Sequence, residues 1–196
     1  MHHNSQYKLI DIQKFLLMLI LMVVTMSSAI AEDRILSRSY WEDASNQASL
    51  DQAQANDFKN YTGVLSRGYT QSAVWIRLEI SPPQGAHAND TLILRIRPIY
   101  LDEITLYDPL DTSNKLRVAG DKTNYGAEEY KSLAHTFSIP AGDKPRYVWL
   151  RLKATSTSLI NVEAFTPEEM LSSEYKLLVG YCLVLSLILV FLILVF

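Results

Sequence analysis

The chain is poor in cysteine and has no run of basic residues, and each absence excludes a class of protein. Its 196 residues contain one cysteine, Cys182, so neither an internal disulfide nor a cysteine-based zinc site can form. The formal net charge is −3, with 18 Lys and Arg against 21 Asp and Glu. This balance leaves no electrostatic footprint for nucleic acid, and we expect no nucleic-acid partner.

Catalytic motifs are also missing. The sequence has no Gly-x-Ser-x-Gly elbow, no His-Glu-x-x-His pair and no phosphate-binding glycine loop. His87 and His135 have no cysteine or second histidine nearby, which favours solvated or core-edge histidines over metal ligands. Asp108, Asp111 and Asn114 could offer oxygens to calcium, but no glycine-centred loop or closing Glu accompanies them, so a plain turn is favoured. We therefore predict no catalytic residues, no metal, no cofactor and no enzymatic activity for this chain.

The apolar residues are spread unevenly, with two long apolar blocks, and the first resembles an export signal. A weakly basic lead precedes the apolar run Phe15–Met26, which is short for a membrane-spanning helix. Small residues follow, and Ala29 and Ala31 fit the Ala-x-Ala cleavage pattern. Residues 1–31 are therefore predicted to be a signal peptide, with an uncleaved signal anchor as the alternative. Both interpretations export the domain that follows, and a disulfide-free exported domain favours a bacterial source.

The second block, Leu177–Phe196, is predicted to be a transmembrane helix. Its 20 residues carry no charge, and as a helix they would span roughly 30 Å, the thickness of the bilayer's hydrocarbon core. Residues 171–196 then form this helix with a short lead-in. No Lys or Arg follows Phe196, although the cytoplasmic side of a membrane helix usually carries them. We expect a piece of a longer membrane protein, with a tail-anchored ectodomain as the alternative.

The domain between the blocks, residues 32–170, has the alternation of antiparallel strands. Apolar and polar side chains alternate over Val74–Ile80, Thr91–Arg97 and Arg146–Lys153. Weaker strands are predicted at Ile35–Tyr40, Tyr100–Tyr107, Lys115–Val118, Leu133–Ile139 and Leu159–Phe165. Ser49 and Gln52 make a capping box that predicts one short helix over Leu50–Asn56. The pattern predicts an all-β domain, an antiparallel β-sandwich with a jelly-roll-like order of strands.

The polar faces of the three clear strands carry aromatic and arginine side chains. If these strands share one sheet, their outward side chains form a platform for a small-molecule or carbohydrate ligand, because flat rings stack on sugars and guanidinium groups donate to hydroxyls or carboxylates. The candidate binding residues are Trp75, Arg77, Arg95, Tyr147, Trp149 and Arg151. The alternative is ordinary cross-strand packing, roofed by the segment Asp43–Gly68. A hydrolase would need two carboxylates on this face, and only Glu79 is placed there.

The order of motifs resembles the type-two extracellular domain of the bacterial seven-transmembrane receptors with diverse intracellular signalling modules. The motifs are Val74-Trp-Ile-Arg-Leu78, Pro98-x-x-Leu-Asp-Glu-Ile-x-Leu-Tyr107, Gly120-Asp121, Thr136-Phe-Ser-Ile-Pro140, Val148-Trp-Leu-Arg-Leu152 and Phe165-Thr-Pro-Glu168. They extend over roughly Ser39 to Met170. The resemblance implies a jelly-roll sandwich similar to carbohydrate-binding domains, followed by seven membrane helices and a cyclase or kinase output. It supplies no catalytic residues.

We therefore expect the ligand-sensing module of a membrane receptor, with residues 32–174 in the periplasm and the helix in the bacterial inner membrane. The partners predicted are a small-molecule or carbohydrate ligand and the lipid bilayer, and the sequence leaves a homodimer open. A structural or adhesive ectodomain without signalling output is the alternative.

Overall fold

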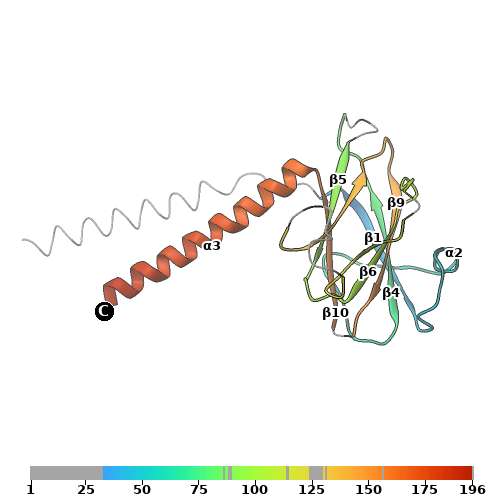
Figure 1. Ribbon diagram of the computed structural model, residues 1–196, viewed down its shortest axis with the longest axis horizontal. Helices are drawn as coiled ribbons and strands as arrows, with labels where there is room; N and C mark the ends of the chain where they lie inside the picture. Colours follow the sequence, from blue (N-terminus) through green and yellow to red (C-terminus); the bar gives the residue numbers. More distant parts are fainter. Residues whose placement is uncertain are drawn as a thin grey trace, which may run out of the picture. The chain divides into compact units, whose positions relative to one another are not determined.

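The protein folds into a two-layered, all-β sandwich followed by one apolar helix (Figure 1). The computed structural model describes residues 33–85, 87, 90–113, 115–123, 130, 132–155 and 157–195. Within them, ten strands form a six-stranded and a four-stranded sheet, and every strand pair is antiparallel. The predicted signal peptide, residues 1–31, lies outside the described residues.

The six-stranded sheet has the strand order β2-β1-β4-β9-β6-β7. Its strands are β1 (Ile35–Asp43), β2 (Lys59–Asn60), β4 (Ala73–Ile80), β6 (Glu103–Tyr107), β7 (Arg117–Ala119) and β9 (Arg146–Lys153). Strands β4 and β9 are central neighbours, with Val74 opposite Leu152 and Ile80 opposite Arg146. Two of the three clear strands predicted from sequence therefore do lie side by side.

The four-stranded sheet has the order β3-β10-β5-β8. Its strands are β3 (Leu65–Tyr69), β5 (Thr91–Arg97), β8 (His135–Pro140) and β10 (Thr157–Phe165). The third clear strand, β5, pairs with β10 and β8 and has no partner in the other sheet.

Alternation along the strands builds the core between the two sheets. The apolar side chains of β4, Val74, Ile76, Leu78 and Ile80, are at most 1% exposed. The corresponding side chains of β5 and β9 are buried as well: Leu92, Leu94, Ile96, Val148, Leu150 and Leu152. Burying a large aliphatic side chain contributes about 1.5–3 kcal/mol, so this shared core accounts for the pairing of the two sheets.

The eight predicted strands are all present, and the all-β sandwich is confirmed. The bounds of β5 and β9 agree with the prediction, whereas β6 begins at Glu103 instead of Tyr100. Strands β2 and β3 were not predicted. The short helix α2 (Leu50–Gln54) has the predicted capping box, in which Ser49 Oγ accepts from Gln52 N and Gln52 Oε1 accepts from Ser49 N.

The C-terminal helix α3 (Pro167–Val195) begins two residues after the end of β10. Its segment Pro167–Ile193 is long and apolar enough to cross a membrane, and its most apolar stretch of 18 residues has a mean hydropathy of 2.6. The helix therefore starts ten residues before the apolar run that predicted it, and its first turn includes Glu168 and Glu169. It also begins four residues before residue 171, the predicted start of the helix with its lead-in.

Candidate functional site

Five of the six predicted binding residues lie on one face of the six-stranded sheet. In the ladder between β4 and β9, Trp75 is opposite Arg151, Arg77 is opposite Trp149 and Glu79 is opposite Tyr147. Because their neighbours along the strands point into the core, these side chains project from the outside of the sandwich. We call this surface the outer face. Trp41 of β1, opposite Trp75, and Tyr107 of β6, opposite Trp149, extend it.

The prediction is wrong for Arg95, which belongs to the other sheet. Arg95 lies on β5, is 7% exposed, and pairs with Glu163 of β10 at 3.0 Å. Its guanidinium also lies 4.6 Å from the centroid of the Phe165 ring. Arg95 therefore stabilises the pairing of β5 with β10 and is no part of the outer face. Alternation predicts the face of a strand on which a residue lies, but it does not predict which sheet the strand joins.

One end of the outer face is covered, as the packing alternative requires. Trp75 is 0% exposed and stacks on Tyr107, with ring centroids 5.3 Å apart. The segment that follows β1 contacts Arg151, the residue opposite Trp75, because Arg151 Nη2 donates to the carbonyl of Asn46 at 2.6 Å. The guanidinium of Arg151 also lies 6.0 Å from the Trp75 ring. Trp75 is therefore a packing residue in this structure, and a ligand cannot reach it without displacing its neighbours.

The open end of the outer face contains Tyr147, Trp149 and Arg77. Tyr147 is 43% exposed, and its ring centroid is 6.1 Å from that of the half-buried Trp149. Arg77 is half-buried between two rings, with its guanidinium carbon 5.1 Å from the Tyr147 centroid and 4.7 Å from the Phe58 centroid. Aromatic rings can stack on a sugar ring, and a guanidinium beside them can donate hydrogen bonds to the sugar oxygens.

Several buried donors of this face have no hydrogen-bond partner in the described part of the chain. They are Trp75 Nε1, Trp149 Nε1 and Arg151 Nε. Each of these N–H groups can donate a hydrogen bond but cannot accept one, so only an acceptor atom could satisfy it. A buried donor without a partner costs about 1–3 kcal/mol, and a ligand could contact these atoms only if the side chains around them moved.

A cleft of about 760 Å³ adjoins the outer face where β3 ends, β4 and β6 begin and β9 ends. Its lining residues are Asn46, Tyr69, Thr70, Gln71, Ser72, Asp102, Glu103, Lys122, Lys153, Ala154 and Thr155. Asn46 and Glu103 connect it to the outer face, because both contact Arg151, at 2.6 and 4.0 Å. Sequence reasoning missed these residues because they come from loops and strand ends that only the fold brings together.

One wall of the cleft is built by a rigid polar corner around Asp102. Its Oδ2 accepts from Lys122 Nζ at 2.7 Å, from Thr155 N at 2.9 Å and from Thr155 Oγ1 at 2.7 Å. The hydrogen bond from Lys122, followed by those from Thr155, lowers the pKa of Asp102 to about 2. The Gly120-Asp121 motif forms the turn that holds Lys122 there, since Asp121 N donates to Leu101 O at 2.9 Å.

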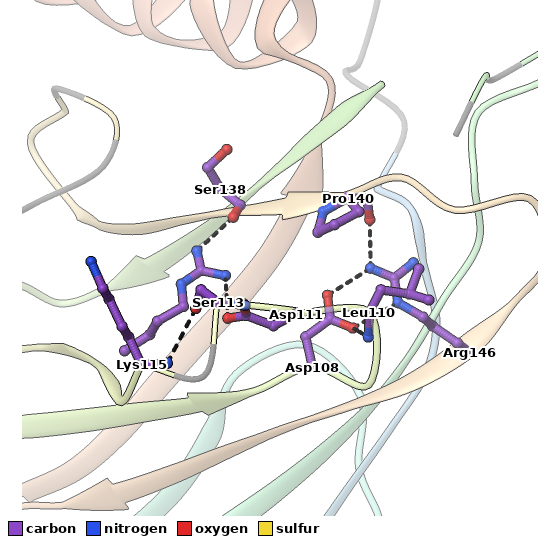
Figure 2. A network of polar contacts seen from close by, with 9 residues as sticks. Asp108, Leu110, Asp111, Ser113, Lys115, Ser138, Pro140 and Arg146 are labelled. Atoms are coloured by element: carbon purple, nitrogen blue, oxygen red, sulfur yellow. Dashed lines mark hydrogen bonds and ion pairs between the residues drawn. The ribbon is translucent and has the colours of Figure 1, made fainter. Parts of the chain in front are cut away.

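The two aspartates considered for calcium are both held by arginines (Figure 2). Asp108 accepts from Arg146 Nε at 3.0 Å and from Arg146 Nη2 at 2.8 Å. Asp111 accepts from Arg117 Nη1 at 3.3 Å and from Ser113 N at 2.8 Å. These contacts agree with a turn, whereas the third residue considered, Asn114, lies outside the described residues. No group of three His, Cys, Asp or Glu side chains in the described segments could hold a metal ion.

Comparison with known proteins agrees with the resemblance found in the sequence. A family model, 7TMR-DISM extracellular 2, matches residues 37–166, which include every strand except the first two residues of β1. No curated protein matches the chain.

Proposed function

Since the chain belongs to the 7TMR-DISM extracellular 2 family, we propose that it is the ligand-sensing module of a bacterial membrane receptor. The family places the sandwich outside the membrane, and the apolar helix that follows β10 suits a membrane anchor. The finer proposal is a sandwich in the periplasm and a helix in the inner membrane. Further membrane helices and an output domain, such as a diguanylate cyclase or a histidine kinase, would complete the receptor.

The genomic reading frame downstream of Phe196 tests the receptor proposal. Further hydrophobic segments followed by a cytoplasmic output domain are the expected result. A stop codon directly after Phe196, together with stable expression of this short form, would contradict it and favour a structural or adhesive ectodomain.

The proposed ligand is a carbohydrate bound at the open end of the outer face. The observation that carries this proposal is the pair of adjacent rings, Tyr147 and Trp149, next to the Arg77 guanidinium. A sugar ring can stack on Tyr147, while Arg77 donates to its hydroxyls. The cleft lies at the opposite end of the outer face, beyond Trp75 and Arg151.

The fold supports a route from the cleft to the membrane helix along β10. Thr155, which lines the cleft, lies just before β10, and Phe165 at its other end lies two residues before α3. The first turn of α3 is tied to the sandwich, because Glu169 Oε1 accepts from Arg34 Nη2 at 2.6 Å and Met170 is 0% exposed. A ligand that binds one arrangement of this strand more tightly than another would shift the equilibrium at the helix.

Binding of a glycan panel by the full chain in lipid nanodiscs tests the ligand proposal. Tyr147→Ala and Trp149→Ala should each weaken binding of the best glycan at least tenfold. Tyr100→Ala is the matched control, because Tyr100 is a tyrosine of similar exposure, 45% against 43%, that belongs to no strand of the outer face. Equal binding by Tyr147→Ala, Trp149→Ala and the control would remove the site from the outer face.

A further inference from the structure

Resting on the proposed function, we infer that the ligand is an acidic saccharide whose carboxylate binds the guanidinium of Arg77. Arg77 differs from the other arginines of the described residues in its ion pairing, in the way its side chain is held, and in its unused donors.

Arg77 is the one arginine of the described residues with no carboxylate within 4.0 Å. The other arginines form ion pairs, which are Arg34–Glu169, Arg38–Asp33, Arg67–Glu42, Arg95–Glu163, Arg97–Glu163, Arg117–Asp111, Arg146–Asp108 and Arg151–Glu103. The carboxylate closest to Arg77 along its own strand, Glu79, accepts instead from Ser37 Oγ at 2.8 Å. A half-buried guanidinium without a counter-ion is unfavourable unless an anion joins it.

The side chain of Arg77 is held in one orientation from three directions. Its Nε donates to Ser39 Oγ at 3.2 Å. The rings of Phe58 and Tyr147 flank the guanidinium, at 4.7 and 5.1 Å from its carbon. Such a group has little rotamer freedom left to lose when a ligand binds, which is the condition for tight and directional recognition.

The terminal nitrogens of Arg77 donate to no group in the described part of the chain, so the forked end of the guanidinium is unused. Two parallel N–H groups match the two oxygens of a carboxylate, and this bidentate pair is stronger than a bond to a neutral hydroxyl. The two ring contacts involve the guanidinium group without using its N–H groups as hydrogen-bond donors to oxygen, so the terminal N–H groups are available.

A sugar ring that carries a carboxylate matches both parts of the site, the Tyr147 ring and the Arg77 guanidinium. Tyr147 lies next to both Arg77 and Trp149, with its ring centroid 5.1 Å from the Arg77 guanidinium carbon and 6.1 Å from the Trp149 centroid, so a sugar stacked on Tyr147 would lie close to the Arg77 guanidinium. A uronic acid unit presents a carboxylate on the edge of a pyranose ring whose faces are partly apolar. We therefore expect uronic acid oligosaccharides to bind in preference to neutral ones of the same size.

The experiment compares trigalacturonate with its methyl-esterified form, and trimannuronate with mannotriose, by calorimetry on the full chain in nanodiscs. The acidic member of at least one pair should bind the wild-type protein at least tenfold more tightly than its neutral counterpart. Arg77→Gln should remove this preference, and Arg77→Lys should restore only part of it, because Lys keeps the charge but lacks the fork. Arg67→Gln is the matched control, since Arg67 also lies over a ring, Tyr40, but is paired with Glu42.

Four results would overturn the inference, and they differ in whether the carbohydrate-sensor proposal survives. Equal binding of acidic and neutral members, or a preference for acid that survives Arg77→Gln, removes the role of Arg77 and leaves a carbohydrate sensor. Binding of neutral glycans only does the same. Binding of no saccharide by a protein whose folding is verified by circular dichroism contradicts the proposed carbohydrate function as well.

Discussion

Tyr61 carries a buried hydroxyl that no group in the described part of the chain satisfies. Its ring packs edge-on against Tyr40, with centroids 6.1 Å apart, and burial raises the pKa of Tyr61 to about 12 although the Arg38 charge lowers it. We predict that Tyr61→Phe leaves the free energy of unfolding unchanged or raises it by up to about 1 kcal/mol, because it removes an unpaired polar atom and keeps the ring. Urea denaturation measures this. A loss above about 1 kcal/mol would reveal a bond to the hydroxyl.

The carboxylate of Asp102 should make stability depend on acid. Its side chain is 9% exposed, and its pKa is lowered from 3.8 to about 2 by the hydrogen bonds from Lys122 and Thr155. Because the folded-state pKa is below the unfolded one, this stabilisation is complete above about pH 4 and is lost as the pH falls toward 2. Asp102→Asn should cost about 1–3 kcal/mol at pH 7 and less at pH 2.

The same series needs a control aspartate that makes no such contacts. Asp57→Asn, on an exposed loop, should change stability by less than about 0.5 kcal/mol at both pH values. If Asp102→Asn lowered the free energy of unfolding by the same amount at pH 2 as at pH 7, the negative charge of Asp102 would not be the source of its stabilising effect.

Gly120 should not tolerate a side chain. Its φ is +139°, and a Cβ there would lie 2.3 Å from the backbone oxygen of Asp102. Gly120→Ala is therefore predicted to lower the free energy of unfolding by roughly 2 kcal/mol or more, through both strain and the loss of the corner. Gly63→Ala is the control, since Gly63 has a φ of +65° but no atom within 4 Å of the place its Cβ would take, and it should cost only about 1–2 kcal/mol. Equal losses of stability in the two variants would mean that the backbone shifts at little cost to make room for a Cβ at position 120.

At the scale of elements, the strong strands were predictable and their partners were not. Alternating side chains define β4, β5 and β9 because one face of each is buried in the core. Strand β3 escaped prediction because it is short, contains Gly68 and buries one apolar residue, Leu65. The grouping of Tyr147, Trp149 and Arg77 needed only the two faces of β4 and β9, so the sequence could supply it. The exclusion of Arg95 required the pairing of β5, a long-range contact that local periodicity does not encode.

The junction between β10 and α3 should depend on Glu169. Glu169 Oε2 accepts from Thr166 N at 2.8 Å, and Thr166 Oγ1 accepts from Glu169 N at 3.2 Å, which makes a capping box at the start of the helix. Glu169 also pairs with Arg34 at 2.6 Å, so it joins the helix to the chain just before β1. We predict that Glu169→Gln keeps the cap but loses the ion pair, and lowers the stability of the sandwich by about 1 kcal/mol.

Glu168→Gln is the matched control for the junction, because Glu168 is the adjacent glutamate of the same turn and has no ion pair among the described residues. Thermal unfolding of the full chain in nanodiscs compares the two variants. If both lowered the midpoint equally, the effect would come from the negative charge of the first turn and not from Arg34.

At the scale of the whole molecule, the chain combines a sandwich with a water-exposed surface and a helix whose surroundings must be apolar. The sandwich belongs to an extracellular family, and the segment Pro167–Ile193 is suited to cross the bilayer. Export would expose the sandwich to aqueous reagents, whereas lipid would shield the middle of the helix. The single thiol of the chain, Cys182, lies in that apolar segment and reports directly on it.

Maleimide labelling of this thiol in spheroplasts that express the full chain tests the membrane placement of the helix. A membrane-impermeant maleimide should not modify Cys182, because the reagent needs a thiolate in contact with water and the hydrocarbon core provides neither. Ser113→Cys, at an exposed site of the sandwich, should react within minutes in the same cells. Detergent should then make Cys182 reactive. Fast labelling of Cys182 without detergent would place the helix in water, whereas protection of Ser113→Cys would place the sandwich inside the cell and contradict its role as an extracellular sensor.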